Sequence, residues 1–166
     1  MVIWLKRQFK NSSVKRMAIQ IFDYDLLSQE ERFFESKAQL SKNLETIISG
    51  KLGGQNVNVI FTSLEKMKDL NYSFRKKKEA TDVLSFNFEE EEFLGEVYIC
   101  PEFVRKSFQG EKFKKETLRL ILHGILHLIG HSHKGQFVEE REDREEMFVE
   151  QEELLQKLCA TIESKD

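Results

Sequence analysis

The sequence has few of the residues that interrupt or cross-link a chain. Its 166 residues include one proline, eight glycines and two cysteines. Cys100 and Cys159 are far apart and neither belongs to a Cys-x-x-Cys pair, which excludes a framework of disulfides. We therefore expect two reduced thiols, as in a cytoplasmic protein.

Long apolar runs are missing as well. No stretch approaches the roughly twenty apolar residues of a membrane-spanning helix. Basic residues at positions 6–10 are not followed by the apolar run of a secretory signal. We therefore expect a soluble, cytoplasmic, monomeric protein with no membrane partner.

The chain is rich in the residues of a core and of a charged surface, with 14 phenylalanines, 40% hydrophobic and 33% charged residues. This composition predicts a single domain over residues 1–166, with residues 1–16 as a possible basic extension. Hydrophobic periodicity predicts strands over 17–24, 56–63, 82–88 and 93–100, and helices over 28–48, 64–74, 102–108, 112–129 and 138–163. The second helix boundary signal is strong at its start, and at 28–31 a capping box predicts that the first long helix begins at Ser28.

The last two strands are joined by a short turn, which indicates antiparallel pairing. We therefore predict an α+β fold with a mixed sheet of about four strands and about five helices. The helix over 112–129 is apolar on nearly all sides, so we expect it at the centre of the domain.

All four histidines lie between His123 and His133. His123 and His127 are four residues apart, so on a helix their imidazoles share one face. Gly130 is where this helix is expected to end in a left-handed conformation, which would bring His133 to the same ion. We predict His123, His127 and His133 as metal ligands and leave His131 outside the set. Three imidazoles around an open position are typical of a catalytic zinc.

The spacing His-x-x-x-His-x-x-Gly-x-x-His is the metal frame of the metzincin peptidases. Gly124 occupies the position of their general-base glutamate, and a glycine cannot accept a proton. A peptidase would need another base, such as Glu96. Glu96 and Asp82 lie in predicted strands, where each is either an outward-facing residue or a carboxylate near the metal.

A run of four cations, Arg75 to Lys78, follows a predicted helix. Such a run is either a solvated loop or a phosphate-binding site, because guanidinium groups match phosphate oxygens and a cationic loop attracts nucleic acid. Cations at 112–119 would extend this surface if they lay on the same side as the metal.

Three blocks of the sequence resemble the YbeY family of bacterial endoribonucleases. They are the histidine block 123–133, the segment 70–75 with 81–86, and the strand segment 95–100. The sequence departs from the family pattern at Ser132, where the family usually has an aspartate. A proton-accepting or orienting role for that carboxylate is therefore in doubt in this chain.

The resemblance implies a zinc-dependent endoribonuclease that cuts single-stranded RNA in 3′-end maturation of small-subunit ribosomal RNA and in ribosome quality control. It implies one zinc ion held by His123, His127 and His133, with Arg75 binding or positioning the RNA. Either water or a ribose 2′-hydroxyl is then the attacking group, while Arg75 stabilises the charge on the phosphate. Two alternatives share these ligands: a metal-dependent peptidase with a non-standard base, and a non-catalytic ribosome assembly factor.

Overall fold

The computed structural model describes the backbone of residues 18–48, 50–88, 90–134 and 141–163, and the side chains of these ranges except 131–144 and 163. The strands are β1 (Ile19–Phe22), β2 (Asn56–Phe61), β3 (Val83–Asn87) and β4 (Phe93–Ile99). The helices are α1 (Lys37–Ile48), α2 (Leu64–Arg75), α3 (Pro101–Val104), α4 (Gly110–Lys134) and α5 (Arg141–Glu163). Two short 3-10 helices, η1 (Tyr24–Leu26) and η2 (Gln29–Glu31), precede α1. None of the described helices is both long enough and apolar enough to cross a bilayer.

The four strands form one mixed sheet in the order β1-β2-β4-β3. β1, β2 and β4 are parallel, whereas β3 pairs antiparallel with β4 at the edge of the sheet. The short connection between β3 and β4 allows this antiparallel pairing, since parallel neighbours need a long crossover. The predicted α+β fold, with a mixed four-stranded sheet and five helices, is confirmed.

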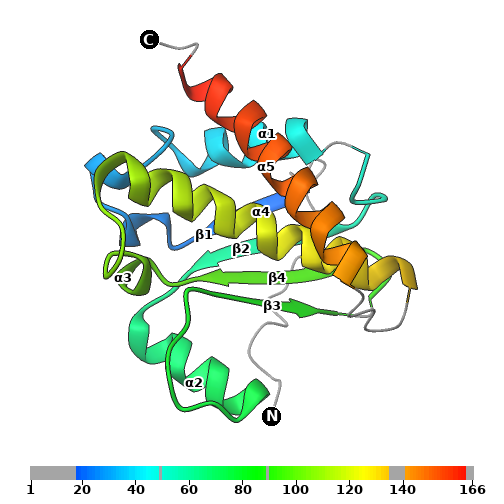
Figure 1. Ribbon diagram of the computed structural model, residues 1–166, viewed down its shortest axis with the longest axis horizontal. Coiled ribbons are helices and arrows are strands. Elements are labelled where there is room, and N and C mark those ends of the chain that lie inside the picture. Colours follow the sequence, from blue (N-terminus) through cyan, green and yellow to red (C-terminus); the bar gives the residue numbers. More distant parts are fainter. Residues whose placement is uncertain (1–17, 49, 89, 135–140, 164–166) are drawn as a thin grey trace, which may run out of the picture.

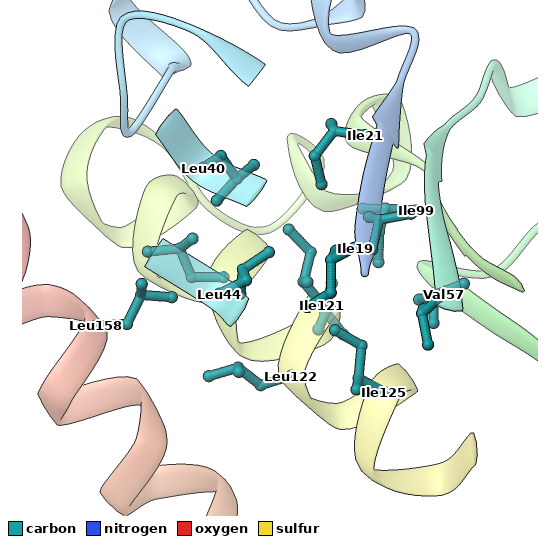
Figure 2. Packing of buried hydrophobic residues seen from close by; sticks show 14 of the residues in the cluster. Ile19, Ile21, Leu40, Leu44, Val57, Ile99, Ile121, Leu122, Ile125 and Leu158 are labelled. Atoms are coloured by element: carbon teal, nitrogen blue, oxygen red, sulfur yellow. The ribbon is translucent and has the colours of Figure 1, made fainter. Parts of the chain in front are cut away.

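Helices α1, α4 and α5 cover one face of the sheet, and α2 lies on the other (Figure 1). The larger core lies between the sheet and the first group, where Ile19, Val57 and Ile99 of the strands meet side chains of α1 and α4 (Figure 2). A smaller core beneath α2 contains Met67 and Tyr98. Alternate residues along each strand therefore face different helices, as the two-residue period of a strand requires.

The capping box at Ser28 is present, but the helix predicted from it is wrong over its first nine residues. The Ser28 backbone N–H donates to Glu31 Oε2 at 2.9 Å, yet this box closes only η2. The physical reason lies in Phe33 and Phe34, which are both buried. Adjacent residues on a helix point about 100° apart, so a helix here would expose one of the two rings. The chain instead stays irregular until α1 begins at Lys37.

Glu31 also anchors this irregular segment to the C-terminal end of α3. Arg105 donates from Nε to Glu31 Oε1 at 2.7 Å and from Nη2 to Oε2 at 2.8 Å. These hydrogen bonds lower the pKa of Glu31 from 4.5 to about 2. A depressed carboxyl pKa stabilises the fold above the unfolded-state value and ceases to do so as the pH falls through the folded-state value.

We therefore expect Glu31→Gln to lower the free energy of unfolding by about 1 kcal/mol at pH 7, because the pair is partly exposed. This loss should shrink as the pH falls from about 4.5 towards 2. Urea titrations of wild type and variant at several pH values measure it, with the exposed Glu30→Gln as the matched control. An equal loss at pH 7 and at pH 2.5 would contradict the assignment.

Candidate metal centre

His123 and His127 face each other on α4, as their spacing predicts. Their Nε2 atoms are 3.0 Å apart and their rings are nearly perpendicular, at 84°. Both side chains are half-buried, so they are held by the fold and yet remain accessible. The remaining turns of α4 place Ile121, Leu122 and Ile125 in the core, which keeps this helix rigid (Figure 2).

This pair of nitrogens fits a zinc ion. Two zinc–nitrogen bonds of about 2.0–2.1 Å at a tetrahedral angle separate the nitrogens by about 3.3 Å. The 3.0 Å between His123 Nε2 and His127 Nε2 is close to that distance. Among the described side chains no group of three His, Cys, Asp or Glu residues gathers around one point. Two of the predicted ligands are therefore brought together, and the third lies outside the described side chains.

The predicted end of the helix at Gly130 is wrong for this structure, because α4 continues through it to Lys134. Gly130 is not among the glycines with a left-handed backbone. On an uninterrupted helix, position 133 lies roughly 80° around the axis from position 123. The side chains of His131, Ser132 and His133 fall outside the described residues, so the assignment of His133 as a ligand stays a prediction.

Gly124 is required by packing as well as being absent as a base. A methyl group at this position would lie 3.0 Å from Val97 Cγ2 and closer still to Cγ1. Val97 is fully buried and β-branched, so it cannot turn both methyl groups away. Position 124 therefore faces β4, and α4 lies against the sheet at the closest distance that a helix backbone allows.

Gln151 of α5 is a neighbour of the histidine pair that the sequence analysis missed. Its side-chain Oε1 lies 2.8 Å from His123 Nδ1, and the residue is only 2% exposed. The signal in the sequence was its position: with Leu154, Leu155 and Leu158 it falls on one helix face at the spacing i, i+3, i+4, i+7. A polar residue in an otherwise apolar stripe indicates a specific buried partner.

A charged network holds Gln151 from behind. The Gln151 amide donates from Nε2 to Glu152 Oε1 at 3.2 Å, and Arg119 of α4 donates from Nε to the same oxygen at 2.6 Å. Arg119 also pairs with Glu116. These contacts raise the pKa of Arg119 and lower that of Glu152. Arg119 therefore joins α4 to α5, and its cation is already engaged by two carboxylates.

Arg75 is exposed at the C-terminal end of α2, where Lys76 takes a left-handed conformation. Buried Asn71 shapes the cationic loop that follows. Its Nδ2 donates to the Glu79 carbonyl at 2.7 Å, and its own carbonyl accepts from the backbone N–H of Lys77 at 3.4 Å. The run of cations is therefore an exposed loop whose base is tied to the core.

Two contacts bring the end of α2 and the histidines to the same edge of the sheet. The ring of Phe74 lies 4.4 Å from that of Phe86 in β3. The next residue of that strand, Asn87, donates from Nδ2 to the carbonyl of Leu128 at 3.4 Å. Leu128 follows His127 directly. The end of β3 therefore connects the two segments that were predicted to contain Arg75 and the metal ligands.

The two strand carboxylates lie away from the histidines. Gly95 and Val97 face α4, so Glu96 between them points to the opposite face of the sheet. There it is 6% exposed and accepts a hydrogen bond from the Tyr98 hydroxyl at 2.7 Å; burial and this carboxylate raise the pKa of Tyr98. Asp82 precedes β3 at the end away from Asn87 and accepts from the backbone N–H of Val83 at 2.8 Å. Neither acid is placed to act at the histidine pair.

The profile of a protein family described as endoribonuclease YbeY matches residues 19–159. The chain belongs to the YbeY family. An endoribonuclease YbeY from Thermotoga maritima is 37% identical over 72% of this chain and 78% of the relative. One from Aquifex aeolicus is 37% identical over 66% of this chain and 77% of the relative.

A solution structure of a protein from Thermotoga maritima is also similar. It has a TM-score of 0.62 and 33% sequence identity, and the match covers 89% of this chain and 93% of that one. The match to the YbeY family extends from β1 into α5. It therefore includes Arg75, His123, His127 and Gln151.

Proposed function

We propose that this protein is a zinc-dependent endoribonuclease that cuts single-stranded RNA. The observation that carries the proposal is the pair of Nε2 atoms, 3.0 Å apart, of His123 and His127 in a chain of the YbeY family. We further propose that its substrate is ribosomal RNA, cut in 3′-end maturation of the small subunit and in ribosome quality control. Action as a cytoplasmic monomer completes this proposal; the buried free thiol of Cys100 suits a reducing compartment.

Three histidines would hold the zinc ion: His123, His127 and His133. When bound, such an ion lowers the pKa of water and polarises a phosphoryl oxygen. The protein contributes ligands that are already oriented, because α4 is packed between the sheet and α5 and because His123 Nδ1 is engaged by Gln151. Ordered ligands need little rearrangement on binding, which favours affinity.

Arg75 would bind the scissile phosphate or a neighbouring one. Its guanidinium is exposed, and the cations at 76–78 extend beyond it in a loop fixed by Asn71. A fixed cationic loop attracts a polyanion and positions it at a defined place. The contacts through Phe86 and Asn87 suit a substrate strand that crosses the β3 edge towards the histidines.

The peptidase alternative lacks a base in the described part of the chain. Position 124 faces Val97 and has no side chain, and Glu96 is on the far face of the sheet. The assembly-factor alternative keeps the same ligands and predicts RNA binding without turnover. An assay of single-stranded RNA beside a peptide library, with zinc counted in the purified protein, distinguishes the three functions.

We expect Arg75→Ala to retain zinc and to lose RNA cleavage by roughly a hundredfold, because a guanidinium no longer stabilises the charge on the phosphate. Lys78→Ala, an exposed cation in the same loop, is the matched control and should lower binding only slightly, with a weaker dependence on salt. Single-turnover cleavage with zinc content measured on the same samples tests this. Cleavage by Arg75→Ala within twofold of wild type would contradict the role.

A further inference from the structure

The ring of His123 is constrained at both nitrogens. Its Nε2 faces His127 Nε2, and its Nδ1 lies 2.8 Å from Gln151 Oε1. A neutral imidazole has one N–H donor and one lone pair. Which nitrogen carries the proton therefore decides whether the lone pair points towards His127, where a metal would bind, or towards α5.

The network behind Gln151 determines this choice. An ionised carboxylate only accepts hydrogen bonds, so Glu152 Oε1 must receive the NH₂ group of the Gln151 amide. That orientation leaves the Gln151 carbonyl oxygen, an acceptor, facing His123 Nδ1. His123 must then donate from Nδ1–H, and its lone pair lies on Nε2.

Glu152 is itself held in place across the helix interface. Arg119 donates from Nε to Glu152 Oε1 at 2.6 Å and from Nη2 to Oε2 at 3.3 Å. The order of dependence is therefore an ion pair between α4 and α5, then the amide orientation of Gln151, then the protonated nitrogen of His123. Each step is a hydrogen bond with a defined donor, and Gln151 is buried from water, which could otherwise satisfy either tautomer.

We propose that Gln151 is the positioning residue of the metal centre: it holds His123 as the Nδ1–H tautomer, with its Nε2 lone pair directed at the ion. The inference rests on the proposed zinc site and adds a residue of α5 to it. Removing the hydrogen-bond partner of a metal-ligating histidine typically costs ten- to a hundredfold in metal affinity. α5 thus prepares the centre without contacting the metal.

The test is Gln151→Met, which keeps the length of the side chain and removes the acceptor. Gln156→Met is the matched control, since it makes the same change at an exposed site of α5. Gln151→Glu restores an acceptor oxygen. Zinc affinity is measured by competition with a chromophoric chelator, and the tautomer of His123 by long-range proton–nitrogen correlation spectra of the metal-free protein.

We expect Gln151→Met to weaken zinc binding ten- to a hundredfold and to lose the single Nδ1–H tautomer of His123. Gln156→Met should match wild type in both measurements, and Gln151→Glu should recover the tautomer. A Gln151→Met protein with unchanged tautomer and zinc affinity within twofold of wild type would overturn the inference.

These measurements separate the inference from the proposed activity. Wild-type protein that binds zinc and leaves RNA intact would overturn only the endoribonuclease function. Wild-type protein that binds no zinc would overturn the metal centre and this inference together.

Discussion

Replacement of His127 by alanine is expected to abolish stoichiometric zinc binding and to reduce RNA cleavage about a thousandfold or more. The variant loses the nitrogen that lies 3.0 Å from His123 Nε2, so at most two of the three predicted ligands remain. Activation of the attacking group and of the phosphoryl oxygen by a metal is worth several kcal/mol, and about 4 kcal/mol corresponds to a thousandfold in rate. His123→Ala should behave in the same way.

His131→Ala is the matched control for these variants, since it removes a histidine of the same segment that lies outside the predicted ligand set. It should retain zinc and cleavage close to wild type. Metal content by elemental analysis and cleavage of a labelled single-stranded RNA are measured on proteins purified identically. Full cleavage by His123→Ala or His127→Ala would refute the metal mechanism.

The second large effect concerns Gly124, where alanine is expected to lower the free energy of unfolding by about 1–3 kcal/mol. The added methyl group meets both methyl groups of the fully buried Val97. Relief requires α4 to move away from β4, and α4 also contacts β3 and α5. The helix that contains His123 and His127 would move with it, so weaker zinc binding should accompany the loss. Urea denaturation of the metal-free protein measures the first effect and chelator competition the second.

Gly130→Ala provides a control of opposite sign on the same helix. Gly130 is exposed, and a methyl group there meets nothing within 4 Å. Alanine in an exposed helical turn should stabilise the metal-free protein by up to about 1 kcal/mol. Equal stability changes for Gly124→Ala and Gly130→Ala would contradict the packing described here.

The same variant tests the predicted role of His133. If zinc binding by His133 requires the chain to leave the helix at Gly130 in a left-handed conformation, Gly130→Ala will weaken zinc affinity while stabilising the metal-free fold. Zinc affinity equal to wild type would show that binding does not need that turn. The stability and affinity of one variant therefore report on two different states of the segment.

Local signals in the sequence predicted the elements well where they were reinforced by packing. Ser63 caps α2 by accepting from the Lys66 backbone N–H, and Pro101 ends β4 by opening α3. The same kind of signal failed at Ser28. Its capping box forms, but burial of Phe33 and Phe34 outweighs helix propensity over the next residues. Gly130 failed for a related reason, since a glycine permits a helix end and does not require one.

The sequence by itself determined the α+β class, the pair of histidines one turn apart and the absence of a base at position 124. These depend on spacing along the chain, and a helix converts a spacing of four residues directly into a shared face. The family resemblance was visible there too, and it is confirmed over residues 19–159.

Only the tertiary structure decided which side chains surround the histidines. Gln151 is 28 residues from His123 in the sequence and 2.8 Å from it in space, whereas Glu96, a candidate base, points to the other face of the sheet. The physical reason is that such neighbours depend on how α5 crosses α4 and on which face of β4 each residue takes. These are consequences of packing between elements, and the periodicity of a single element does not contain them.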